Sequence, residues 1–137
     1  MTVLRVDHIA VVVPDMDIAL DFWQKALGLP LAHVEEVPAQ QTAVALMPVG
    51  DCEVELVQPT SDTSGMARYM DRRGPGLHHI CFEVDDLEAT LAQLRETDIR
   101  LINEEPVTGA GGKKVAFVHP KSASGVLVEL VQSETVL

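Results

Sequence analysis

Two histidines and two glutamates recur at matching places in this chain, and all four side chains are common metal ligands. His8 opens the stretch "HIAVVVPD" and His79 opens "HICFEVDD", so each begins an apolar run that ends in acidic residues. Glu55 and Glu129 are each followed by Leu-Val, and they come 47 and 50 residues after the respective histidines. This spacing indicates an internal duplication with one His–Glu pair in each half.

The expected strands determine where these side chains point. Side chains alternate between the two faces of a strand, so His8 and His79 should face away from the bulky apolar residues that follow them. The same alternation places Glu55 and Glu129 opposite the apolar residues on either side of them. If the two halves pair side by side, we expect all four side chains to meet on one face of a sheet.

Two imidazole nitrogens and two carboxylate oxygens suit a borderline divalent ion such as Co²⁺, Mn²⁺, Ni²⁺, Zn²⁺ or Fe²⁺. We therefore predict that His8, Glu55, His79 and Glu129 bind a metal. Closed structural zinc sites usually use Cys and His, so the mixed set favours an open site with room for water or substrate oxygens. His78 should lie on the other face of its strand, with a structural role or a hydrogen bond to a ligand.

The first half of the chain has the pattern βαβββ. A strand is expected over 4–13, and Pro14 and Asp15 then begin a helix that ends at Gly28. Apolar residues at helical spacing form one stripe of this helix: Met16, Ala19, Leu20, Trp23, Ala26 and Leu27. Strands should follow at 31–37, 41–48 and 52–58.

The second half repeats this order. A strand over 79–84 precedes a helix with the stripe Leu87, Leu91 and Leu94, which a capping box of Asp85 and Glu88 should begin. The remaining strands are expected at 99–103, 114–119 and 126–131.

We predict one α+β domain over 1–137, in which tandem βαβββ modules form a concave mixed sheet. The modules span about 4–59 and 77–132, and a linker over 60–76 contains a turn and one short helix.

Composition excludes several classes of protein. A net charge of −11 argues against nucleic acid or an anionic membrane as the main partner. No apolar run approaches the ~20 residues of a membrane span, and the start of the chain does not resemble a signal peptide. Cys52 and Cys81 form neither a disulfide framework nor a CxxC metal site, so a cytoplasmic location is expected.

Several stretches resemble a known family: "DHIAVVVPD", "RRGPGLHHICFEVDD" and "HPKSASGVLVEL". They are similar to the vicinal oxygen chelate superfamily, which includes glyoxalases, bleomycin resistance proteins and dioxygenases, and within it to the methylmalonyl-CoA epimerase branch. The resemblance implies metal-dependent epimerisation of (R)- and (S)-methylmalonyl-CoA, by α-proton abstraction and reprotonation through a metal-stabilised enediolate. It also implies Co²⁺, with Mn²⁺, Ni²⁺, Zn²⁺ or Mg²⁺ as alternatives, and a homodimer, which is common in the family.

The resemblance implies the same four metal ligands and gives Glu129 a second role as an acid/base. Some epimerases have another glutamate in the strand before Glu55, but the matching position here is Val44. The second acid/base is therefore open among Lys114, Glu53 and a metal-held water. A substrate with CoA phosphates would need cations and polar contacts, for which the expected residues are Gln40, Lys113, Lys114, Lys121 and Ser122.

Two other functions use the same fold. A glyoxalase I-type enzyme isomerises a thiol adduct with a similar ligand set and also moves a proton. A non-catalytic resistance protein sequesters a small molecule in the same concave sheet, and such relatives often lack the metal ligands that this chain retains.

Overall fold

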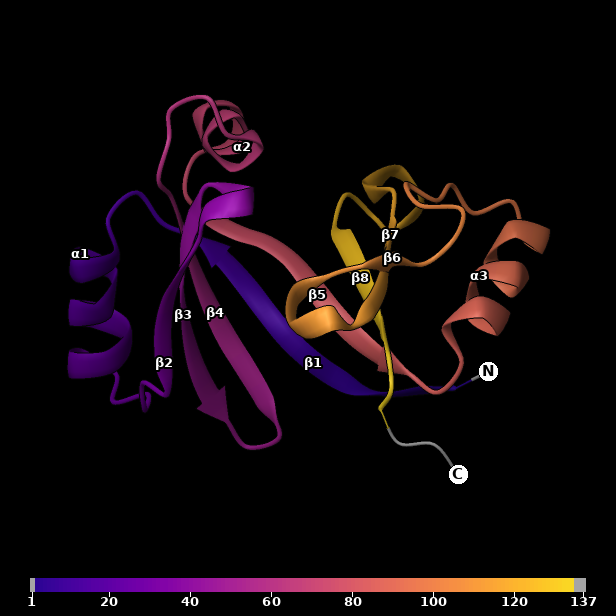
Figure 1. The fold of residues 1–137 in the computed structure, drawn as a ribbon, viewed down its shortest axis with the longest axis horizontal. Helices are drawn as coiled ribbons and strands as arrows, with labels where there is room; N and C mark the ends of the chain where they lie inside the picture. The colour runs from indigo at the N-terminus through magenta and orange to yellow at the C-terminus, as the bar shows by residue number, and fades with distance from the viewer. Residues whose placement is uncertain (1, 135–137) are drawn as a thin grey trace. The chain divides into compact units, whose positions relative to one another are not determined.

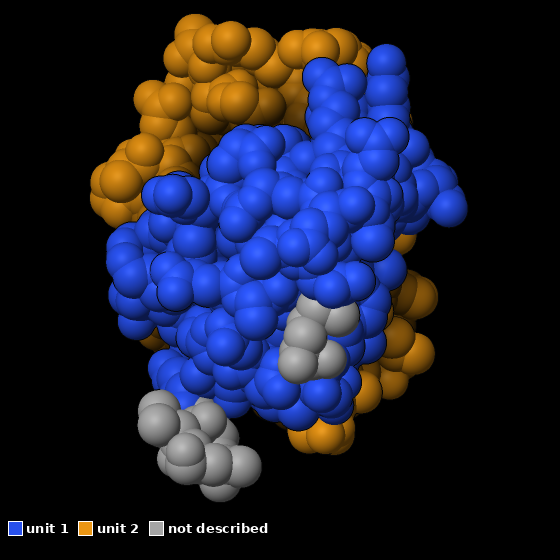
Figure 2. Space-filling view, turned by 90° about the vertical axis from the view of Figure 1, so that its right-hand side faces the viewer, with its two compact units in different colours: residues 1–8, 79–137 blue, residues 9–78 orange. Residues whose placement is uncertain are grey.

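The computed structural model describes residues 2–134 and divides into two compact units (Figures 1 and 2). Unit 1 contains residues 1–8 and 79–137, and unit 2 contains residues 9–78. The first strand, β1 (Val3–Val12), therefore contributes residues to both units. That the whole chain is one domain with modules over about 4–59 and 77–132 stays a prediction.

Unit 2 contains the βαβββ pattern expected for the first half. Its strands have the order β2 (His33–Val37), β3 (Thr42–Val49), β4 (Cys52–Pro59) and the later part of β1. The helices are α1 (Met16–Leu20), which continues as a π-helical turn over Asp21–Ala26, and α2 (Gly65–Arg73), with a 3₁₀ turn at Pro38–Gln40. The helix predicted in the 60–76 linker is thus confirmed as α2.

In unit 1, the first strand of the sheet is the early part of β1. The order continues through β5 (Gly76–Val84), β8 (Leu127–Gln132), β7 (Lys114–Val118) and β6 (Val107–Thr108). The helical segments are α3 (Leu87–Glu96) and 3₁₀ turns at Ala110–Gly112 and Pro120–Ser122. Strands β5 and β8 are parallel, whereas β8, β7 and β6 are antiparallel, so the sheet is mixed as predicted.

Each unit buries an apolar core between one sheet face and one helix, as the alternation of its strands predicts. In unit 1, Val84 and Leu130 pack with the predicted stripe of α3, in which Leu87 and Leu91 are buried and Leu94 is half-buried. In unit 2, Val13 and Leu56 pack with the stripe of α1. The faces opposite these helices carry smaller apolar clusters together with ionisable side chains such as Glu129.

The helix after β1 differs from its prediction near its end. Leu27 was expected in the apolar stripe but is 54% exposed, and Leu29 packs on the core in its place. The cause is the π-helical turn, in which the Leu27 N–H donates to the Phe22 carbonyl five residues earlier. This wider turn changes the direction in which the side chains at its end point. The helix ends as predicted at Gly28, whose φ of +88° suits glycine.

Two predictions for the second half are wrong in detail. The expected strand over 99–103 is reduced to a single bridge between Leu101 and Val118, because the Asn103 side chain accepts the Phe117 N–H in place of a ladder bond. The N-cap of α3 is Asp86 rather than Asp85: Asp86 accepts from the Ala89 N–H, whereas Asp85 accepts from Thr2.

A matched pair of glutamines fixes the start of each helix to the last strand of its half. The Gln58 side chain on β4 accepts the Met16 N–H at 2.6 Å, and the Gln132 side chain on β8 accepts the Leu87 N–H at 2.8 Å. These glutamines stand three residues after Glu55 and Glu129. The strand that presents each glutamate is therefore also the strand that holds the helix.

The corrected cap of α3 can be tested by mutation. Asp86→Ala leaves the Ala89 N–H without its acceptor, and we expect the free energy of unfolding to fall by about 1 kcal/mol. Asp86→Asn keeps a capping oxygen and should stay within a few tenths of a kcal/mol of the parent. Urea unfolding followed by circular dichroism measures both, and equal losses in the two variants would contradict the assignment.

Candidate metal centre

Three of the four predicted ligands converge within unit 1. His8 Nε2 lies 3.1 Å from His79 Nε2, and Glu129 Oε1 lies 3.3 Å from the first nitrogen and 3.1 Å from the second. The side chains are only 10% to 15% exposed. Their strands explain the meeting: β1 and β5 present the histidines, and β8 is the parallel neighbour of β5, with Glu129 in register with Cys81.

The separations fit donors that share one ion. Two donors bound at about 2.1 Å lie ~3.0 Å apart at neighbouring octahedral positions and ~3.4 Å apart in a tetrahedron. The three observed separations, 3.1 Å, 3.1 Å and 3.3 Å, fall between these values. The three atoms can therefore bind the same divalent ion, and two imidazoles with one carboxylate match the chemistry that such an ion prefers.

The surroundings of this triad are apolar on the sheet face opposite α3. Cys81, Val115 and Val131 are buried there, and Phe117 packs against them. Phe117 also meets the His79 ring edge-on, with ring centroids 6.0 Å apart. Such a lining excludes water around Glu129 and strengthens the attraction between charges.

Contacts within the triad favour the charged forms of Glu129 and His8. Burial alone would raise the pKa of Glu129, but its contacts with His79 and His8 outweigh this effect and lower it to about 2. Burial likewise opposes a charge on His8, but hydrogen bonds with Asp7, Cys81 and Glu129 raise its pKa to about 12. Glu129 is therefore a carboxylate that can bind a cation or accept a proton.

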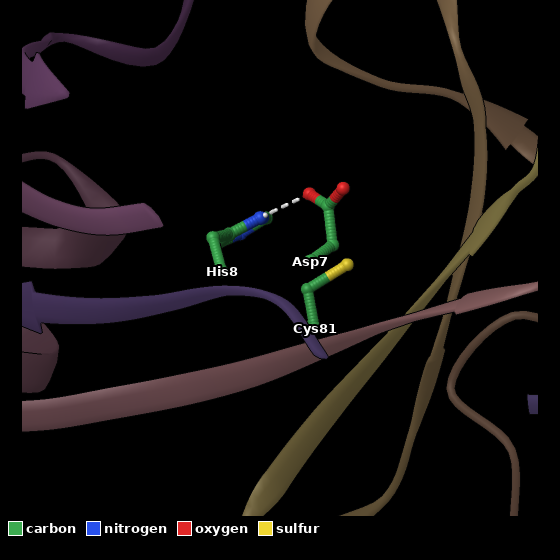
Figure 3. A group of neighbouring side chains, drawn as sticks. All are labelled: Asp7, His8 and Cys81. Atoms are coloured by element: carbon green, nitrogen blue, oxygen red, sulfur yellow. Dashed lines mark hydrogen bonds and ion pairs between the residues drawn. The ribbon is translucent and has the colours of Figure 1, made fainter. Parts of the chain in front are cut away.

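A second group of side chains lies at the other nitrogen of His8 (Figure 3). Asp7 Oδ2 is 2.8 Å from His8 Nδ1, and a ring nitrogen of His8, a carboxylate oxygen of Asp7 and the Cys81 thiol lie within 4.8 Å of one another. Burial raises the pKa of the Cys81 thiol to about 11, so the thiol is neutral at physiological pH. Among the described residues, these two groups are the clusters of metal-binding side chains, and His8 belongs to both.

Sequence reasoning missed Asp7, which strict alternation places on the opposite face from His8. The side chains nevertheless meet. Asp7 Oδ2 lies 2.8 Å from His8 Nδ1, so these two adjacent side chains bend toward each other. A carboxylate next to a candidate ligand in the sequence is the signal that could have identified it.

The fourth predicted ligand belongs to unit 2. Glu55 is half-buried on β4, opposite Leu56 and therefore on the face away from α1. The apolar cluster of that face contains Ala10, Val44 and Val57, so position 44 is a packing site. His78 has a structural contact as expected: its ring meets that of Tyr69, with centroids 4.5 Å apart.

The five residues expected at a substrate lie in both units. Gln40 is exposed in the 3₁₀ turn of unit 2. In unit 1, the Lys114 ammonium donates to the Thr108 hydroxyl at 3.0 Å, and the Ser122 hydroxyl accepts the Arg100 N–H at 2.9 Å. Lys113 is half-buried and Lys121 is exposed. All five side chains stay predictions as substrate contacts.

Comparison with known proteins places the chain in a family. Residues 7–117 match the model of the Glyoxalase/Bleomycin resistance protein/Dioxygenase superfamily, and the chain belongs to this superfamily. The expected resemblance and the α+β fold with a mixed sheet are thereby confirmed. No helix in residues 2–134 is long and apolar enough to cross a membrane.

Its relatives include named epimerases. Human mitochondrial methylmalonyl-CoA epimerase is 37% identical over 94% of this chain and 74% of its own length. The ethylmalonyl-CoA/methylmalonyl-CoA epimerase of Cereibacter sphaeroides is 35% identical over 93% of this chain and 97% of its own. Among solved structures, a Streptomyces coelicolor methylmalonyl-CoA epimerase variant in complex with 2-nitronate-propionyl-CoA has a TM-score of 0.85 and 31% identity, covering 98% of each chain.

The triad makes a direct prediction about metal affinity. His79→Ala removes one donor atom of the site. Loss of a residue that only hydrogen-bonds a metal ligand typically weakens metal binding 10- to 100-fold. We therefore expect removal of the ligand itself to weaken Co²⁺ binding by more than about 100-fold. Isothermal titration with Co²⁺ measures it. His33→Ala, which alters an exposed histidine that contacts Glu35, is the control and should leave the affinity unchanged. Equal affinities in the parent and His79→Ala would contradict the assignment.

Proposed function

We propose that this chain is a metal-dependent epimerase that interconverts (R)- and (S)-methylmalonyl-CoA. The observation that supports it most directly is the convergence of His8, His79 and Glu129 on one face of a sheet. The similarity to named epimerases over more than nine-tenths of the chain supports the substrate. Glu55, which repeats the position of Glu129 in the other half, is proposed as the fourth ligand.

The reaction needs charge stabilisation at an acidic carbon. The α-proton of methylmalonyl-CoA lies between a thioester and a carboxylate, so its removal leaves negative charge on oxygen. A bound divalent ion supplies a Lewis acid for that oxygen. The chain itself would hold and orient the ligands, while the apolar side chains around Glu129 exclude water and so keep the electrostatic stabilisation strong.

Glu129 is proposed to accept and return one proton. It is ionised at neutral pH, as a proton acceptor must be. Epimerisation also needs a donor on the opposite face of the carbon. Val44 cannot serve, because its side chain has no ionisable group. Lys114, Glu53 and a metal-held water are the candidates proposed for this role.

Cations of unit 1 are proposed to bind the CoA phosphates despite the overall acidity of the chain. Lys113, Lys114 and Lys121 supply positive charge from β7 and its flanking turns, and Ser122 retains a hydroxyl proton to donate. Gln40 is proposed as a further polar contact to the substrate. These assignments follow the resemblance of the segment "HPKSASGVLVEL" and its neighbours to the epimerase branch.

The finer properties of the protein are proposals as well. Co²⁺ is the proposed ion, since two imidazoles and carboxylate oxygens in an open site suit it. A cytoplasmic location and a homodimer follow from the composition and from the epimerase resemblance, respectively.

Hydrogen exchange at the α-carbon tests the function. In heavy water, we expect the protein to incorporate deuterium at the α-carbon of methylmalonyl-CoA, and a chelator should slow the incorporation. Glu129→Gln should slow it by at least about 100-fold, because general acid–base catalysis typically contributes that much. Mass spectrometry measures the label, and Glu88→Gln, an exposed position on α3, is the matched control.

The alternatives give different outcomes in the same laboratory test. A glyoxalase-type enzyme would turn over the methylglyoxal–glutathione adduct and leave methylmalonyl-CoA unlabelled. A resistance-type binding protein would label and convert neither compound. Full exchange activity in Glu129→Gln would remove Glu129 from the mechanism.

A further inference from the structure

The two nitrogens of His8 have different partners. Nε2 faces His79 and Glu129, whereas Nδ1 lies 2.8 Å from Asp7 Oδ2. A neutral imidazole has one N–H and one lone pair, so Nε2 can bind an ion only when the proton is on Nδ1. The partner of Nδ1 therefore decides whether His8 is ready to bind.

Both carboxylate oxygens of Asp7 are engaged. Oδ2 accepts from His8, while Oδ1 lies 3.0 Å from Arg5 Nη2. The Arg5 guanidinium also reaches Glu83, with 3.5 Å between Nε and Oε1. With one oxygen assigned to each partner, the Asp7 carboxylate cannot rotate without breaking a charged contact.

The nearby thiol is a weaker partner for the same nitrogen. Cys81 is fully buried, and its sulfur is a weak hydrogen-bond acceptor, so the Asp7 carboxylate is the stronger acceptor for an N–H of His8. The arrangement also has no counterpart in the duplicated half, where His78 stands at the position of Asp7 and packs against Tyr69.

We propose that Asp7 is a positioning residue: its carboxylate, held in place by Arg5, binds the N–H at Nδ1 of His8 and so directs the Nε2 lone pair toward the metal. The proposal rests on the proposed function only in requiring a divalent ion. A carboxylate behind a ligating histidine fixes the orientation of the ring and increases its basicity.

Metal affinity is the first test. Asp7→Ala should weaken Co²⁺ binding by 10- to 100-fold in isothermal titration, as is typical for loss of such a partner. Asp7→Asn retains an oxygen acceptor without the charge and should lose less. Glu83→Gln is the matched control, because it removes a carboxylate from the same arginine and leaves the Asp7–His8 contact in place, and it should stay within about 2-fold of the parent.

Two further readouts separate positioning from a general structural role. Excess Co²⁺ should restore α-carbon exchange in Asp7→Ala, since a deficit of affinity is overcome by concentration and a misfolded site is not. In the Zn²⁺-loaded, isotope-labelled protein, nitrogen NMR should show a protonated Nδ1 on His8. This signal should persist in Glu83→Gln and be lost or exchange rapidly in Asp7→Ala.

The outcomes distinguish this inference from the proposed function. Unchanged affinity in Asp7→Ala, or an equal loss in Glu83→Gln, would overturn the role of Asp7 while leaving epimerase activity intact. Weakened binding in Asp7→Ala with no exchange by the parent would support Asp7 and overturn the function. A parent protein that binds no divalent ion would overturn both. If Asp7→Ala fails to fold, Asp7→Asn and the NMR signal decide.

Discussion

The carboxylate of Glu129 between two imidazole rings is the interaction on which the remaining features of the site depend. A buried carboxylate in an apolar surrounding costs several kcal/mol unless it is paired. Here the cost is offset by His8 and His79, which lie 3.3 Å and 3.1 Å from Oε1. The same arrangement that makes the charge tolerable also places three donor atoms close enough to share one ion, so the pairing of Glu129 and the candidate metal site have one geometry.

The duplication explains how a chain of 137 residues can place such a group reliably. In each half, one strand contains Glu-Leu-Val-Gln. The glutamate lies on one face, the leucine lies on the helix-packed face, and the glutamine accepts the first N–H of a helix. A shift of one residue in this strand would bury the glutamate under the helix and lose the glutamine contact. The register of the ligand strand is therefore fixed by the packing of the helix.

Strand alternation and repetition made most of this predictable. They predicted the helix-packed faces, the βαβββ order of the first half, and the meeting of His8, His79 and Glu129. They failed where side chains replace backbone bonds, as Asn103 does in the reduced strand at 99–103, and where a π-helical turn rotates Leu27 into solvent. Asp7 was missed because alternation places it on the face opposite His8, although the two side chains meet at 2.8 Å. The fourth ligand, Glu55, stays a prediction because it belongs to the other unit.

The departures from the duplication are as informative as its regularities. His8 and His79 are equivalent, yet His8 is backed by a carboxylate at 2.8 Å, whereas His79 meets the Phe117 ring edge-on. The two equivalent histidines thus have different neighbours. A thioester and a carboxylate flank the reacting carbon of the proposed substrate, so the substrate is itself unsymmetrical. A site whose two equivalent histidines have unlike neighbours can distinguish the two ends of such a substrate, which a fully symmetrical site could not.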